Sequence, residues 1–153
     1  MVGGQTIRDI VTSPLPEVQT LTSQTLRVLY VDDDQQGCEM ILEFFRHHNP
    51  SFEVTIVPNT HAAALSIALG KFDIYVIDNW LPGQTGVEFC HEIRLSDTST
   101  PIIIYSAVAG QANIDEGLAA GANVYLIKPD DLMNLGPTIE QLILAKTAAL
   151  HAT

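Results

Sequence analysis

From Leu26 onward the chain alternates between short apolar segments and longer segments in which apolar residues recur every three or four positions. Short runs rich in β-branched residues are typical of buried strands, whereas i, i+3, i+4, i+7 spacing is typical of an amphipathic helix. The helical spacing is clearest at Cys38, Ile41, Leu42 and Phe45. The pattern predicts strands over residues 26–31, 53–57, 73–77, 101–105 and 124–127, and helices over residues 36–49, 60–70, 86–95, 112–120 and a final segment that ends near residue 150.

The regular order of strand, helix, strand determines the fold class. Strand starts lie some twenty to thirty residues apart, which is the length of one strand plus one crossover helix. Because such crossovers are right-handed, the units build a five-stranded parallel sheet with helices on both faces, an α/β doubly wound fold. The final helix either begins at Pro137 or kinks there, since proline is tolerated in a first turn but not in a helix interior.

Composition limits the remaining possibilities. The 153 residues suit one domain over residues 26–150, and residues 1–25, rich in Gly, Pro, Ser and Thr, are predicted to be a tail outside the core. The net charge of −11 argues against nonspecific binding to nucleic acid or to an anionic membrane. No secretory signal or membrane-spanning run is visible, so we expect a cytoplasmic protein.

The two cysteines are too few for a disulfide scaffold and favour a reducing compartment. Cys38 belongs to the first predicted helix and Cys90 to the third, and the expected topology places these helices on opposite faces of the sheet. A disulfide needs Cα atoms within about 7 Å of each other. Both residues are therefore expected to be free thiols.

Four of the five predicted strands end in polar residues. Because parallel strands share a direction, these side chains gather at one edge of the sheet, where ligands of open α/β folds bind. Several carboxylates crowded at that edge would repel one another without a cation, and a hard oxygen-liganded ion such as Mg²⁺ suits them. The residues concerned are Asp32, Asp33 and Asp34 after the first strand, Asp78 after the third, Ser106 after the fourth and Lys128 after the fifth.

Such a group of residues suits phosphoryl transfer. A strand-end carboxylate such as Asp78 can attack phosphorus and form an acyl phosphate. Lys128 can neutralise one phosphoryl oxygen, and Ser106 can donate a hydrogen bond to another. Simpler interpretations remain open for single residues: Asp34 is expected to be the N-cap of the following helix, and Ser106 or Lys128 could be an ordinary strand-end residue.

Four segments together resemble the receiver domain of two-component response regulators. They are VLYVDDD at 28–34, VIDNWLPGQTG at 76–86, PIIIYSA at 101–107 and GANVYLIKP at 121–129. The resemblance covers roughly residues 26–150. It implies a flavodoxin-like sheet in the order 2-1-3-4-5, and a signalling switch that accepts a phosphoryl group on Asp78 from a histidine kinase or phosphotransfer protein.

The same resemblance assigns roles to individual residues. It implies Mg²⁺ bound by Asp33, Asp78 and the backbone carbonyl of Trp80, with Asp32 acting largely through water. Ser106 and Lys128 would bind the phosphoryl group. The switch would consist of Ser106 and an aromatic residue, Tyr125, that turns from solvent to a buried rotamer. A downstream protein would then read the face formed by the fourth helix, fifth strand and fifth helix.

Departures from the family pattern are few. Thr85 stands where the family often has Asp before the turn glycine. The bulk of Trp80, beside the pocket, is expected to slow the entry of a phosphoryl group or water. The Gly136-Pro137 pair alters the last helix, which often contributes to a dimer surface, so formation of a homodimer stays open.

Two other functions compete with the signalling switch. A phosphohydrolase of the haloacid dehalogenase kind needs a second Asp two residues after the nucleophile, where this chain has Trp80. An interaction module that works without phosphate would not require the full set of strand-end residues. If the chain is complete, no effector domain is attached to the receiver, which leads us to expect a non-enzymatic, stand-alone switch.

Overall fold

The computed structural model describes residues 24–152, and the predicted tail lies almost wholly outside them. Five parallel strands form one sheet in the order β2-β1-β3-β4-β5, as expected. The strands are β1 (Leu26–Val31), β2 (Phe52–Val57), β3 (Ile74–Ile77), β4 (Ile102–Ser106) and β5 (Val124–Ile127). The helices are α2 (Gln35–His48), α3 (Thr60–Leu69), α4 (Gly86–Arg94), α5 (Gln111–Ala119) and α6 (Leu132–His151).

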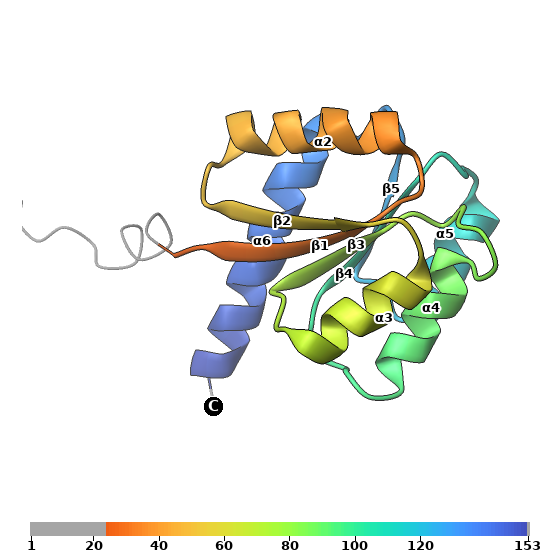
Figure 1. Cartoon of the computed structure of the whole chain (residues 1–153). Helices are drawn as coiled ribbons and strands as arrows, with labels where there is room; N and C mark the ends of the chain where they lie inside the picture. Colours follow the sequence, from red (N-terminus) through yellow and green to blue (C-terminus); the bar gives the residue numbers. More distant parts are fainter. Residues whose placement is uncertain (1–23, 153) are drawn as a thin grey trace, which may run out of the picture.

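Helices α2 and α6 cover one face of the sheet, and α3, α4 and α5 cover the other (Figure 1). The sheet separates two apolar cores, because alternate residues of each central strand point to opposite faces. Leu29 and Val31 of β1 face α3, α4 and α5, whereas Val28 and Tyr30 face α2 and α6. The central strands are buried on both sides, which accounts for their nearly continuous apolar sequence. This packing holds the C-terminal ends of β1, β3, β4 and β5 at one edge.

The two cysteines lie in different cores. Cys38 packs with α2 and α6, and Cys90 with the helices on the other face. Both are free thiols, which confirms the expectation from the topology. Burial raises the pKa of Cys38 to about 11, so its thiol is protonated at neutral pH.

Two details of the helices correct the predictions. Asp34 occupies the N-cap position of α2, but its side chain makes no capping hydrogen bond. The final helix begins at Leu132, five residues before Pro137, and runs through the proline. The turn before α6 explains this early start, because the carboxylate of Asp131 accepts hydrogen bonds from the Ile127 backbone N–H (2.8 Å) and the Asn134 side-chain amide (3.0 Å).

Pro137 lies in the second turn of α6 and, having no backbone N–H, leaves the helix without one i→i−4 hydrogen bond. The neighbouring Gly136 is needed for packing: a side chain there would collide with the ring of His48 on α2. The Gly136-Pro137 pair thus marks a contact between α2 and α6, not a helix boundary. No helix within residues 24–152 has the length and apolarity needed to span a membrane.

Candidate functional site

Three carboxylates meet at the C-terminal edge of the sheet. Asp32 and Asp33 follow β1, and Asp78 follows the adjacent β3. One oxygen of each lies within 4.8 Å of the others, with Asp32 and Asp78 buried and Asp33 exposed. Oxygen ligands of this kind and spacing suit a hard divalent cation such as Mg²⁺. The donor set therefore fits the ion expected from the sequence.

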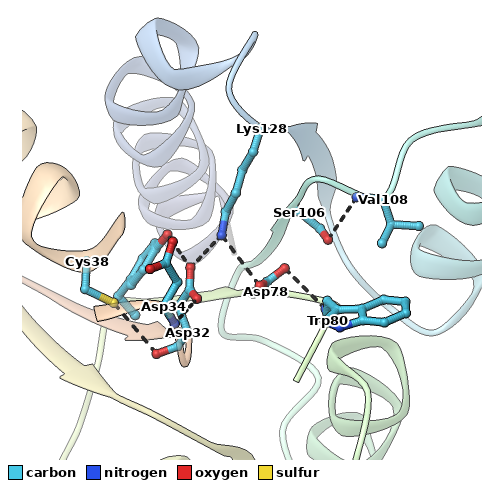
Figure 2. Close-up of polar contacts among 9 residues, drawn as sticks. Asp32, Asp34, Cys38, Asp78, Trp80, Ser106, Val108 and Lys128 are labelled. Carbon is cyan, nitrogen blue, oxygen red and sulfur yellow. Dashed lines mark hydrogen bonds and ion pairs between the residues drawn. The ribbon is translucent and has the colours of Figure 1, made fainter. Parts of the chain in front are cut away.

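Lys128 at the end of β5 reaches across the edge to two of these carboxylates (Figure 2). Its ammonium nitrogen lies 2.5 Å from Oδ2 of Asp32 and 3.6 Å from Oδ2 of Asp78. The ammonium group also lies 5.3 Å from the centre of the Tyr105 ring, a cation–π distance. Lys128 thus places a compact positive charge beside the carboxylate of Asp78.

Asp32 differs from the other two carboxylates because protein donors occupy both of its oxygens. Oδ1 accepts the backbone N–H of Asp34 at 2.9 Å. Oδ2 accepts the hydroxyl of Tyr30 at 3.2 Å in addition to Lys128. The sequence prediction did not include Tyr30, which is fully buried beneath the site. Asp32 is therefore held in place, with little capacity left to coordinate a metal directly.

Asp78 lies in a polar but poorly hydrated environment, with 9% of its surface exposed. Burial raises its pKa above the ordinary value and the charge of Asp32 adds to this, while Lys128, Ser106 and the backbone N–H of Trp80 act in the opposite direction. That N–H lies 3.3 Å from Oδ1 of Asp78. A cation near Asp78 would favour its ionised form.

Trp80 follows Asp78 by two residues, and its indole is 77% exposed. In Figure 2 the ring extends away from Asp32 and Lys128. The side chain therefore does not cover the carboxylates in this arrangement.

Ser106 at the end of β4 is completely buried, and its Oγ accepts the backbone N–H of Val108 at 3.3 Å. The carbonyl of Val108 in turn accepts the hydroxyl of Tyr125 at 2.6 Å. Tyr125 is only 8% exposed and packs in the core. The sequence led us to expect a solvent-exposed resting position for this ring, and the structure shows it already buried.

The space that Tyr125 fills exists because α5 carries a glycine at position 117. A Cβ at Gly117 would lie 2.8 Å from a ring carbon of Tyr125 and 3.0 Å from the Ile104 side chain. The sequence prediction included neither the space that Gly117 leaves for Tyr125 nor the link between Ser106 and Tyr125 through the backbone of Val108. A glycine in the middle of an otherwise helical segment was the available signal.

Comparison with known proteins identifies the family. Residues 28–140 match the model of the response regulator receiver domain. Response regulator ArlR of Staphylococcus epidermidis is 36% identical over 109 residues, which cover 71% of this chain and 48% of ArlR. Transcriptional regulatory protein CseB of Streptomyces coelicolor is 35% identical over 107 residues, covering 68% of this chain and 43% of CseB. The chain thus spans about half the length of the curated relatives it matches.

Solved structures show the same fold. The receiver domain of Francisella response regulator 1452 superposes with a TM-score of 0.73 at 28% identity, covering 78% of this chain and 98% of that one. A CheY-like receiver domain protein from Methanospirillum hungatei gives a TM-score of 0.75 at 22% identity, covering 82% and 99% of the two chains. The chain belongs to the response regulator receiver domain family of two-component systems.

Proposed function

We propose that this protein is a phosphorylation-controlled switch whose receiver domain, residues 26–150, accepts a phosphoryl group on Asp78. The observation that carries the proposal is the position of Lys128, whose ammonium group contacts the carboxylates of both Asp32 and Asp78. The buried hydroxyl of Ser106 lies at the end of β4, the strand next to β5. A nucleophilic carboxylate, a fixed positive charge and a hydroxyl donor are what transfer to an aspartate requires.

In the proposed site, Asp33 and Asp78 would hold Mg²⁺ together with the backbone carbonyl of Trp80. Asp32 would contribute through water, because protein donors already occupy its two oxygens. When bound, the ion supplies positive charge that offsets repulsion between the carboxylates and the incoming phosphoryl oxygens. The carboxylate separation of at most 4.8 Å supports this assignment.

The transfer step breaks a phosphorus–nitrogen bond in the donor and forms a phosphorus–oxygen bond on Asp78. A carboxylate oxygen attacks the phosphorus of a phosphohistidine on the kinase or phosphotransfer protein. The imidazole leaves with the bonding electrons and is protonated by solvent. Lys128 and Ser106 would bind two of the phosphoryl oxygens, which places charge-assisted hydrogen bonds where negative charge is added.

The readout would use the face formed by α5, β5 and α6. Tyr125 on β5 is linked to Ser106 through Val108, so a change at the serine reaches this face. A downstream protein that recognises the buried arrangement of Tyr125 would respond to phosphorylation. The net charge of −11 over the whole chain supports a protein partner over nucleic acid.

Mass spectrometry after incubation with acetyl phosphate and Mg²⁺ tests the proposal. We expect the wild type to gain one phosphoryl group, Asp78→Asn to gain none, and Asp34→Asn to label like the wild type because Asp34 contributes only its backbone N–H to Asp32. Labelling that persists in Asp78→Asn would refute the assignment. An unlabelled but folded wild type would favour an interaction module that works without phosphate.

A further inference from the structure

Asn79 connects the loop after β3 to the first turn of α4. Its side-chain oxygen accepts the backbone N–H of Val87 at 3.0 Å. Its backbone carbonyl accepts the N–H groups of Leu81 and Gly86, both at 3.1 Å. Three backbone donors thus converge on one residue, which lies between Asp78 and Trp80 in the sequence.

The start of α4 is pressed closely against this loop. A Cβ on Gly86 would lie 2.9 Å from the Asn79 Cα and closer still to the carbonyl oxygen of Asp78. The helix therefore meets the backbone of Asp78 and Asn79 without an intervening side chain. The bond from Val87 to Asn79 fixes the position of the loop along this contact.

We propose that Asn79 is a positioning residue for the divalent-cation site. Its side chain would hold the peptide that carries the Trp80 carbonyl at a fixed distance from the Asp78 carboxylate. This inference rests on the proposed function, in which both groups bind Mg²⁺. Residues that orient metal ligands without touching the metal typically change metal affinity by about 10–100-fold when they are mutated.

The alternative is that Asn79 only caps α4, and the chain offers a matched control for that role. Thr85 is the N-cap of the same helix: its hydroxyl accepts the Glu88 N–H at 3.1 Å, and Glu88 bonds back to the Thr85 N–H at 2.9 Å. Thr85→Ala removes a capping bond from α4 without removing the bond from Val87 to Asn79. Conversely, the Thr85 capping box remains in Asn79→Ala, so that α4 is still expected to form.

The experiment measures Mg²⁺ affinity of the full chain by calorimetry, with thermal unfolding of each variant recorded with and without Mg²⁺. We expect Asn79→Ala to weaken Mg²⁺ binding by about tenfold, whereas Thr85→Ala stays within about twofold of the wild type although it loses similar stability. Asn79→Asp retains an acceptor oxygen for the Val87 N–H and should bind Mg²⁺ more tightly than Asn79→Ala.

Equal Mg²⁺ affinity in Asn79→Ala and Thr85→Ala would overturn the inference and leave Asn79 as a helix cap. A wild type that does not bind Mg²⁺ at all would instead overturn the metal site in the proposed function, and this inference with it. The two failures are therefore distinguished by the wild-type titration alone.

Discussion

Replacing Gly86 by alanine tests whether the close contact between α4 and the Asp78 loop is rigid. The added Cβ would lie 2.9 Å from the Asn79 Cα and closer to the Asp78 carbonyl oxygen. Carbon atoms in contact are normally about 3.5–4.0 Å apart. Both partners are backbone atoms, so the helix and the loop must separate by at least about half an ångström, with no side chain able to rotate away.

Forced separation of packed elements costs about 1–3 kcal/mol, and we expect Gly86→Ala at the upper end. For a domain of this size each kcal/mol corresponds to roughly 3–5 °C in Tm, so the melting temperature should fall by about 10 °C. A typical domain stability of about 5–15 kcal/mol leaves the variant folded. Because the displaced atoms belong to Asp78 and Asn79, Mg²⁺ binding should weaken as well.

Gly83 in the same loop provides the control. Its φ of 85° favours glycine, but no atom lies within 4 Å of a Cβ added there. Gly83→Ala therefore introduces only backbone strain, worth about 1–2 kcal/mol, without displacing α4. Differential scanning calorimetry of the two variants decides the question. If Gly86→Ala melts no lower than Gly83→Ala and binds Mg²⁺ like the wild type, the contact between α4 and the Asp78 loop can adjust to an added Cβ and is not rigid.

Two further substitutions test other parts of the fold. Burial raises the pKa of Asp97, but hydrogen bonds from Thr100 and Ser99 outweigh this and lower the pKa from 3.8 to about 2. The ionised carboxylate therefore stabilises the folded protein fully above the unfolded pKa of 3.8, and this stabilisation is lost as the pH falls through the folded pKa of about 2. Asp97→Asn should cost about 1 kcal/mol at neutral pH, and urea denaturation should show the difference from wild type shrinking below about pH 4; a pH-independent difference would contradict this. Gly117→Ala should push the Tyr125 ring out of its buried site. Because burial raises the pKa of Tyr125, that pKa should then return toward its ordinary value, as measured by fluorine NMR of fluorotyrosine-labelled protein. An unchanged Tyr125 titration would show that the buried ring does not require a glycine at position 117.

The fold and the main site residues could be predicted because both depend on local patterns. Buried parallel strands must be apolar along their length, and polar residues mark where they end at a common edge. These patterns predict a common edge for Asp32, Asp78, Ser106 and Lys128, and the structure has all four residues there. The order of the strands, in contrast, was implied only by the resemblance of the four motifs to the receiver family.

The remaining features depend on conformation that no short pattern encodes. Asn79 precedes a Pro-Gly turn, and from the sequence it is typical of an ordinary turn residue. Only the structure shows that its side-chain oxygen accepts the backbone N–H of Val87 in the first turn of α4. Tyr30 and Asp32 lie two residues apart, on the same face of an extended chain, but the bond from the Tyr30 hydroxyl to the Asp32 carboxylate also depends on the rotamers of both side chains. Of the two alternatives for the last helix, a start at Pro137 is wrong, because Asp131 accepts a backbone N–H four residues earlier in the chain and organises the turn from which α6 begins.

The buried position of Tyr125 changes how the proposed switch would work. Val108 donates to Ser106 and accepts from Tyr125, so the serine and the tyrosine already form one hydrogen-bonded chain. Phosphorylation of Asp78 would then stabilise this arrangement against one with the ring exposed. A shift from about 1% to 99% occupancy requires about 5.5 kcal/mol, and charge-assisted bonds from Lys128 and Ser106, about 1.5–3 kcal/mol each, are of that order. The phosphoryl group would thus select an existing arrangement of the α5, β5 and α6 face. The free energy for this selection would come from the bonds that Lys128 and Ser106 make to the phosphoryl group, at the end of the hydrogen-bonded series away from Tyr125.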